Sequence, residues 1–164
     1  MNHSLKLFAA ALAAIGLLAG CSSVSLDEGA KSGTLASEAV NPFEDPSNPL
    51  SQRSIYFAFD SYDVASEYAP VVEAHARWLV DHPEASVVVQ GNTDERGGRE
   101  YNLALGQKRS EAVRQRMQLL GVNPDRVEAI SFGKEKPVAT GSTEEAWAQN
   151  RRADIVYQQS DSKN

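Results

Sequence analysis

The sequence predicts a two-layer α/β sandwich, in which helices pack on one face of a mixed β-sheet. In residues 54–158, short runs with strand periodicity alternate with longer runs of helical periodicity, in the order β-α-β-α-β-(α)-β. This segment has the length of one ordinary domain. The only cysteine, Cys21, lies outside it, so no internal disulfide can hold the domain and an apolar core must do so.

The domain is expected to begin with a strand and an amphipathic helix. Residues 54–60 alternate, with aromatic side chains on both faces, which predicts a strand. Apolar residues then recur at helical spacing over residues 64–79. Asp63 or Ser61 is the expected N-cap of this helix, and the His-Pro pair at 82–83 should end it.

The other elements follow from the same two periodicities. Gly91 should end the second strand, and Gly121 and Pro124 should close the long helix. The expected elements are a buried strand at 86–90, a polar loop at 92–99, a long helix at 100–120, a strand at 126–132, a loop at 133–143, a short helix at 143–149 and a last strand at 152–157.

The first twenty residues have the pattern of a secretory signal peptide. Lys6 is their only charged residue, residues 7–18 are almost wholly apolar, and small residues lead to Cys21. The apolar run is shorter than the roughly 20 residues of a spanning helix. Its Leu-Ala-Gly-Cys end resembles the lipobox of bacterial lipoproteins, which implies cleavage before Cys21 and its acylation. By the same resemblance Ser22 indicates the outer membrane. The alternative is an ordinary signal peptide with an incidental cysteine.

Residues 22–53 are rich in Ser, Gly, Pro and acids, which predicts a flexible tether between the lipidated cysteine and the domain. Fully extended, this tether would reach on the order of 110 Å. Residues 159–164 are expected to be a disordered tail. After removal of residues 1–20, 15 basic and 22 acidic residues remain, a net charge of −7. This balance argues against binding of nucleic acid or anionic lipid heads, so membrane attachment must come from acyl chains.

One arginine of the long helix is a candidate for binding. Arg109 lies four residues from both Leu105 and Val113, inside the apolar stripe. A guanidinium there needs an anionic partner or must line a cleft. Asp94 and Asp60 precede the helix at loop and strand ends, so Arg109 could hold a carboxylate while the two acids hold an ammonium. A structural Arg–Asp ion pair is the commoner alternative, and spacing alone leaves both open.

Four segments resemble, in order over residues 54–157, the OmpA-like peptidoglycan-binding family. The family binds the diaminopimelate of uncrosslinked stem peptides, whose side chain ends in a zwitterion. The four segments are Gly91-Asn-Thr-Asp-Glu-Arg-Gly97, Glu100-Tyr-Asn-Leu-Ala-Leu-Gly-Gln-Lys-Arg109, Gly133-Lys-Glu-Lys-Pro137 and Asn150-Arg-Arg-Ala153.

The resemblance assigns roles by position. Asp94 and Arg109 match the family's acid and arginine, and the Phe59-Asp60 pair matches the residues beside the ligand. Asn102 matches a helix asparagine expected to support the loop. The chain departs from the family at Ala58, where an aspartate is common, which should change only the rim of the site. It also has Gly98-Arg99 for a frequent Thr-Pro, which should add flexibility and a positive charge near the site, and Gly106 where many members carry Ser.

The resemblance further implies a non-enzymatic outer-membrane lipoprotein that anchors the membrane to peptidoglycan within the Tol-Pal system, with a TolB-like periplasmic protein as partner. No cofactor or metal is expected, because neither His75 nor His82 has a cysteine or paired acid placed to complete a zinc site. Two alternatives are an adaptor that binds only proteins and a peptidoglycan-modifying enzyme. Against the enzyme, carboxylates beside an arginine stay ionised and are poor general acids.

Overall fold

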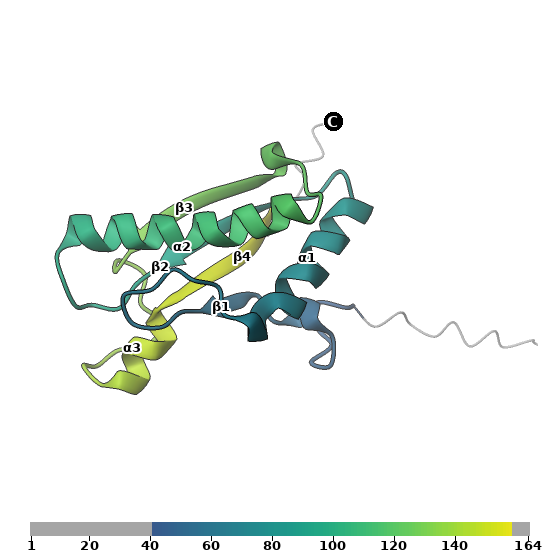
Figure 1. Ribbon diagram of the computed structural model, residues 1–164. Coiled ribbons are helices and arrows are strands. Elements are labelled where there is room, and N and C mark those ends of the chain that lie inside the picture. The colour runs from purple at the N-terminus through teal and green to yellow at the C-terminus, as the bar shows by residue number, and fades with distance from the viewer. Residues whose placement is uncertain (1–40, 159–164) are drawn as a thin grey trace, which may run out of the picture. The chain divides into compact units, whose positions relative to one another are not determined.

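The computed structural model describes residues 41–158, so the predicted signal peptide, Cys21 and the tail lie outside the described residues (Figure 1). The order of elements agrees with the predicted one. The elements are the turn η1 (Pro49–Ser51), β1 (Ser54–Tyr56), the turn η2 (Ser66–Tyr68), α1 (Ala69–Asp81), β2 (Ser86–Asn92), α2 (Arg99–Leu119), the turn η3 (Pro124–Arg126), β3 (Val127–Gly133), α3 (Glu144–Asn150) and β4 (Arg152–Gln158).

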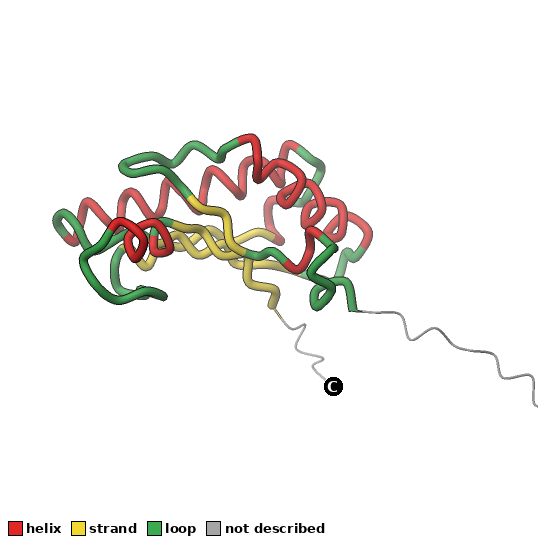
Figure 2. The backbone as a smooth tube through the Cα atoms, turned by 90° about the horizontal axis from the view of Figure 1, so that it is seen from below, coloured by secondary structure: helices red, strands yellow, loops and turns green. Residues whose placement is uncertain are grey.

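The four strands form one mixed sheet in the order β1-β4-β2-β3. β2 and β3 run parallel, whereas β4 is antiparallel to both β1 and β2. α1 and α2 lie together on one face of the sheet, and α3 lies beside the loops at one end (Figures 1 and 2). The predicted two-layer α/β sandwich is therefore confirmed.

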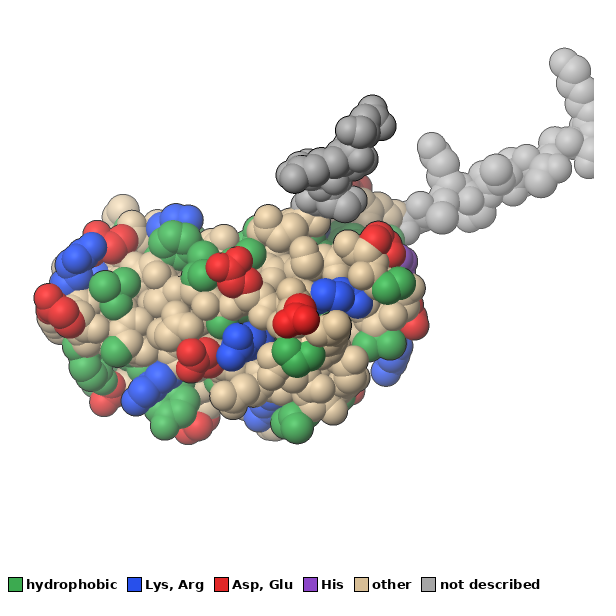
Figure 3. Space-filling view, turned by 90° about the horizontal axis from the view of Figure 1, so that it is seen from above, with side chains coloured by type: hydrophobic (Ala, Val, Ile, Leu, Met, Phe, Trp, Pro, Cys, Tyr) green, Lys and Arg blue, Asp and Glu red, His purple; other side chains and the backbone are tan. Residues whose placement is uncertain are grey.

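The core fills the space between the sheet and the two long helices. Alternate residues of the strands point to this face because side chains alternate along a strand, and α2 contributes Val113 and Met117, both fully buried. The fully buried apolar side chains include Ile55, Leu79, Val87, Val89, Val113, Met117 and Ile155. On the molecular face drawn in Figure 3, acidic and basic side chains are interspersed among apolar ones.

Two glycines let α2 approach β2 closely. A Cβ atom on Gly91 would lie 1.8 Å from the carbonyl oxygen of Gly106, and one on Gly106 would lie 2.3 Å from the Ser131 hydroxyl. Gly106 lowers the intrinsic helix propensity of α2 by up to about 1 kcal/mol relative to alanine. The packing explains its presence, because no larger side chain fits at this crossing.

The first strand is shorter and the first helix begins later than predicted. β1 ends at Tyr56. Beyond it, the Phe57 amide donates to the Arg151 carbonyl at 2.8 Å, and the Ala58 carbonyl accepts a hydrogen bond from Arg109. Neither Asp63 nor Ser61 caps a helix. α1 starts after Tyr68, which makes no side-chain capping bond. Val64 is buried in the core as predicted, but from a loop.

Residues 41–53, here called the N-terminal strap, were assigned by the sequence to the tether but pack against the domain. Phe43 makes edge-on contacts with Trp78 and Tyr157, at ring-centre distances of 5.1 and 4.9 Å. The Arg53 guanidinium lies 5.1 Å from the ring centre of Phe43. The packed part of the chain therefore includes residues 41–53, which the sequence assigned to the tether. Their Ser- and Pro-rich composition gave no signal for the few aromatic and apolar residues that pack against the domain.

The buried histidine of α1 belongs to the same region. The ring nitrogens of His75 lie 2.8 Å from the Tyr157 hydroxyl and 2.9 Å from the Gln52 carbonyl oxygen. Burial lowers the pKa of His75 below its usual value, although the Gln52 carbonyl raises it. His82 stacks on Trp78 at 4.0 Å. Both histidines make hydrogen bonds and pack against aromatic rings.

No helix between residues 41 and 158 combines the length and the apolar character needed to cross a bilayer.

Candidate functional site

A cavity of about 260 Å³ lies where the loop after β1, the end of β2 and the first half of α2 meet. The structure brings to this one cavity all four residues that the sequence predicted for a binding site, although they come from three separate segments. The lining residues are Phe59, Asp60, Thr93, Asp94, Arg96, Gly97, Tyr101, Asn102, Leu105, Arg109 and Arg151.

Arg109 is completely buried, with 0% of its side chain exposed. Its Nε donates to the Ser61 carbonyl at 2.8 Å, one terminal nitrogen donates to the Asn92 carbonyl at 2.8 Å, and the other to the Ala58 carbonyl at 3.2 Å. A guanidinium carries five N–H groups, so two have no partner within residues 41–158 and remain for a ligand. Burial and, next, the nearby Arg151 lower the pKa of Arg109 to about 10, so it remains charged at neutral pH.

Asp94 forms ion pairs with two other arginines. The terminal nitrogen of Arg96 lies 2.6 Å from its carboxylate, and that of Arg151 lies 3.5 Å away. Burial raises the pKa of Asp94, but its hydrogen bonds with Arg96 outweigh this effect and the pKa is lowered. Within residues 41–158, Asp94 thus forms ion pairs with Arg96 and Arg151. It forms none with Arg109, so the structural ion pair that the sequence left open as an alternative is not found there.

Arg96 is fixed at the mouth of the cavity, and sequence reasoning missed it. Its guanidinium lies between two aromatic rings, 4.2 Å from the ring centre of Phe59 and 3.9 Å from that of Trp147. Such cation–π contacts hold a charged side chain in one position. Arg96 stands two residues after Asp94 in the quoted loop motif, and this spacing was the available signal. The stacking partners could not be found because they are distant in sequence.

Asp60 has an unusual backbone conformation. Its φ of 55° lies in the left-handed region, which aspartate tolerates better than most residues. The Tyr101 hydroxyl donates a hydrogen bond to its carboxylate. Asp60 has no ion pair among the described residues. It is therefore the carboxylate of the cavity that can accept a ligand cation.

The loop of residues 93–98 is held from two sides. Asn102 donates to the Arg96 carbonyl at 2.9 Å, which confirms its expected role as support for the loop. The Lys134 ammonium donates to the carbonyls of Glu95 and Gly97, at 3.1 and 2.9 Å. The loop is thereby ordered before any ligand binds.

The charges that line the cavity sum to an excess of one positive. Three guanidiniums (Arg96, Arg109 and Arg151) face two carboxylates (Asp60 and Asp94). This composition suits a ligand that carries both carboxylate and ammonium groups. Within residues 41–158, His, Cys, Asp and Glu side chains form no group of three or more placed to hold a metal ion.

The residues that depart from the family pattern lie at the rim or outside the cavity. Ala58 contributes its carbonyl to Arg109, so the missing aspartate side chain leaves that contact intact. Arg99 is exposed and pairs with Glu135 at 3.2 Å. It does not line the cavity, so the predicted positive charge lies beside the site and outside its lining. The two arginines after α3 pair with nearby acids, Arg151 with Glu144 at 2.7 Å and Arg152 with Asp154 at 2.9 Å.

A small α/β domain with a preformed, charged cavity is the class of protein that this fold and site define. Residues 56–151 match the model of the OmpA family. The chain is 39% identical to the peptidoglycan-associated lipoprotein of Haemophilus influenzae, covering 87% of this chain and 92% of that one. It is also 39% identical to the protein of that name from Pseudomonas aeruginosa, covering 90% and 94%.

Solved structures agree with these relatives. The crystal structure of the peptidoglycan-associated lipoprotein from Burkholderia pseudomallei is 58% identical, has a TM-score of 0.69, and is matched over 72% of this chain and 100% of that one. The C-terminal domain of Helicobacter pylori MotB, 22% identical with a TM-score of 0.61 over 66% and 85%, shares the fold alone. The chain therefore belongs to the OmpA family and, within it, to the peptidoglycan-associated lipoproteins. The family is non-enzymatic, so these relatives confirm the prediction that the chain is not an enzyme.

Proposed function

We propose that this protein anchors the outer membrane to the cell wall without a covalent bond to peptidoglycan. Acyl chains on Cys21 would hold the N-terminus in the membrane, and the folded domain would grip the diaminopimelate of a stem peptide. One observation carries the second half of this proposal: within residues 41–158, a buried arginine with two unused N–H groups and a carboxylate without an ion pair, Asp60, line the same cavity. The names of the relatives support the first half.

The diaminopimelate side chain ends in a carbon that bears both a carboxylate and an ammonium group. In the proposed mode, Arg109 donates its two free N–H groups to the carboxylate, and Asp60 accepts from the ammonium. Asp94 acts indirectly, because it holds Arg96 and Arg151 beside the carboxylate. Phe59 and Leu105 supply apolar surface for the methylene groups of the ligand. The hypothesis drawn from the sequence had Asp60 and Asp94 both hold the ammonium. In the proposed mode, Asp60 alone holds it.

The wider role is inferred from the family resemblance. Membership of the Tol-Pal system and a TolB-like partner would connect this anchor to envelope integrity and cell division. An adaptor that binds only proteins is the alternative, and retention on purified cell wall distinguishes the two.

The test uses the chain without its lipid, residues 22–164, mixed with purified sacculi and recovered by sedimentation. Wild type is compared with Arg109→Ala and Asp94→Ala, and with the control Arg99→Ala, which removes an exposed arginine outside the cavity. Circular dichroism checks each fold. We expect retention of wild type and the control and loss of both cavity variants. Equal retention of all four would assign binding to another surface, and no retention of wild type would favour the adaptor.

A second measurement tests the ligand chemistry. Calorimetry would compare a stem tripeptide that ends in diaminopimelate with one that ends in lysine, which keeps the ammonium but lacks the side-chain carboxylate. A site built to bind a carboxylate leaves buried N–H groups unpaired with the lysine peptide. We therefore expect the lysine peptide to bind roughly 100-fold or more weakly. Equal affinities would contradict the assignment of Arg109.

A further inference from the structure

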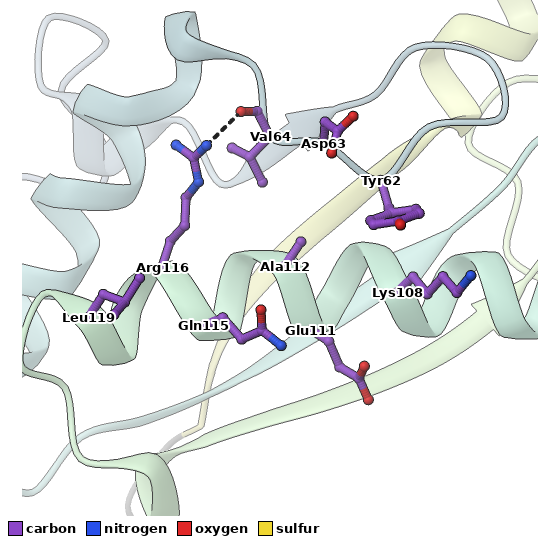
Figure 4. A pocket seen from close by; sticks show the side chains of 9 residues that line it. All are labelled: Tyr62, Asp63, Val64, Lys108, Glu111, Ala112, Gln115, Arg116 and Leu119. Carbon is purple, nitrogen blue, oxygen red and sulfur yellow. Dashed lines mark hydrogen bonds between the residues drawn. The ribbon is translucent and has the colours of Figure 1, made fainter.

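A second hollow, here called the α2 groove, is lined by residues of the same helix (Figure 4). It has a volume of about 360 Å³ and lies between the loop of residues 62–64 and the second half of α2. Tyr62 and Lys108 lie at one end in Figure 4, and Arg116 and Leu119 at the other. The lining residues are Tyr62, Asp63, Val64, Lys108, Glu111, Ala112, Gln115, Arg116 and Leu119.

The groove and the cavity share one wall. The loop that carries Phe59 and Asp60 into the cavity carries Tyr62 into the groove only two residues later. Arg109 holds this loop from inside through the Ser61 carbonyl, and Arg116 holds its far end through the Val64 carbonyl at 2.9 Å. This loop is thus held at both ends, and the two hollows lie next to each other along it.

The chemistry of the groove suits a sugar. Tyr62 is 45% exposed, and the Lys108 ammonium lies 5.2 Å from its ring centre. An exposed aromatic ring offers an apolar face for the C–H side of a pyranose. Carboxylate, amide and ammonium groups from Asp63, Gln115 and Lys108 can bond hydroxyl and acetamido groups. Charges of both signs line the groove, so neither a strongly acidic nor a strongly basic ligand is favoured.

We propose that the α2 groove binds the amino sugar to which the stem peptide is attached. This rests on the proposed function, since it assumes that diaminopimelate occupies the first cavity. The α2 residues of the two hollows centre about nine residues apart, or roughly 14 Å, and the two sets of lining residues meet at Lys108 and Arg109. Two stem residues and the lactyl ether separate diaminopimelate from the sugar and span on the order of 10 Å when extended. Because the lining residues of the two hollows adjoin on α2, a linker of this length lets one ligand enter both hollows at once.

The test compares two ligands on each variant of the chain 22–164 by calorimetry. One ligand is the free stem tetrapeptide containing diaminopimelate, and the other carries the same peptide on its disaccharide. In wild type the disaccharide should raise affinity by roughly fivefold, as one aromatic contact of about 1 kcal/mol gives. In Tyr62→Leu this gain should disappear while tetrapeptide affinity stays unchanged. The matched control is Tyr56→Leu, which removes another partly exposed tyrosine outside both hollows and should keep the gain.

The outcomes separate the two proposals. Tetrapeptide binding with no gain from the disaccharide, or a gain that survives in Tyr62→Leu, would overturn the sugar site and leave the groove to a protein segment. A gain lost equally in Tyr56→Leu would also overturn it. If wild type bound neither ligand, the proposed function would fail first, and the sugar site with it.

Discussion

The two ends of the sheet are built from opposite kinds of side chain. Where β2 ends, Gly91 meets the backbone of α2, and the buried groups around it are charged, with Arg109 and Asp94 foremost. At the other end, Phe43 and Tyr157 pack in an aromatic cluster of the N-terminal strap, α1 and β4. We call these the site end and the aromatic end. The difference indicates that one end supplies stability and the other keeps charge available for a ligand.

Energetics support this division. Burial of aromatic surface stabilises a fold by about 25 cal/mol per Å², whereas a buried guanidinium must recover its hydration through hydrogen bonds. Arg109 does so only in part, because its three carbonyl partners leave two N–H groups free. A cavity with such an incompletely satisfied ion binds a carboxylate more strongly than a fully paired one would.

The largest effect is expected from Gly91→Ala at the site end. Its Cβ would lie 1.8 Å from the Gly106 carbonyl oxygen, which is backbone and cannot move aside cheaply. Overpacking of this kind costs about 3 kcal/mol or more of the free energy of unfolding, measurable by urea denaturation. The control is Gly98→Ala, where a Cβ meets nothing within 4 Å. A stable Gly91→Ala variant would show that α2 can move away from β2.

This crossing also shows what the sequence could reveal. Periodicity predicted the element order, the mixed sheet and the placing of Arg109 on the buried stripe of α2, because those depend on local patterns. No packing role was predicted for Gly106, because its contact with Gly91 joins two elements through their backbones. The late start of α1 and the docking of the strap were missed for the same reason: tertiary contacts override local preference.

The candidate site, too, could be predicted from the sequence only in part. Asp94, Arg109 and the Phe59-Asp60 pair were predicted from their positions in the motif. The partners of each were not, because the carbonyl cage of Arg109 and the rings around Arg96 come from segments far apart in the chain. A charged residue signals that a partner is required, but it does not say which one.

A pair of phenylalanines tests the division between the ends. Phe43→Ala removes packing from the aromatic end and should lower the free energy of unfolding by about 1–2 kcal/mol, with tetrapeptide affinity unchanged. Phe59 is 62% exposed and stacks on Arg96. Its Phe59→Ala variant should leave stability within about 0.5 kcal/mol but weaken binding roughly fivefold. Thermal denaturation and calorimetry on both variants measure this, and two variants with the same profile would refute the division.

A smaller effect should appear in the pH dependence of stability. Burial lowers the pKa of His75, so the unfolded chain binds this proton more readily than the folded one. The contribution of the neutral ring is present above the unfolded pKa of about 6.5 and is lost as pH falls below it. The lowered pKa of Asp94 acts only below its usual value of 3.8, outside this window.

Denaturation between pH 7 and 5 measures this slope. His75→Gln should flatten it, whatever the variant does to stability at pH 7. The matched control, His82→Gln, removes the histidine that stacks on Trp78 at the same end. If the His75→Gln variant kept the wild-type slope, another group would be responsible for the pH dependence. If both variants flattened the slope equally, the burial of His75 would not be its cause.

The smallest effect is expected from Arg99→Gln, beside the site end but outside its cavity. Arg99 pairs with Glu135 at 3.2 Å, and both side chains are exposed. Exposed ion pairs contribute about 0–1 kcal/mol, because water and salt screen them. We expect the free energy of unfolding to change by less than about 0.5 kcal/mol and tetrapeptide affinity to stay the same. A loss of affinity as large as that of Arg109→Ala would mean that the positive field around the cavity, rather than its buried arginine, holds the ligand.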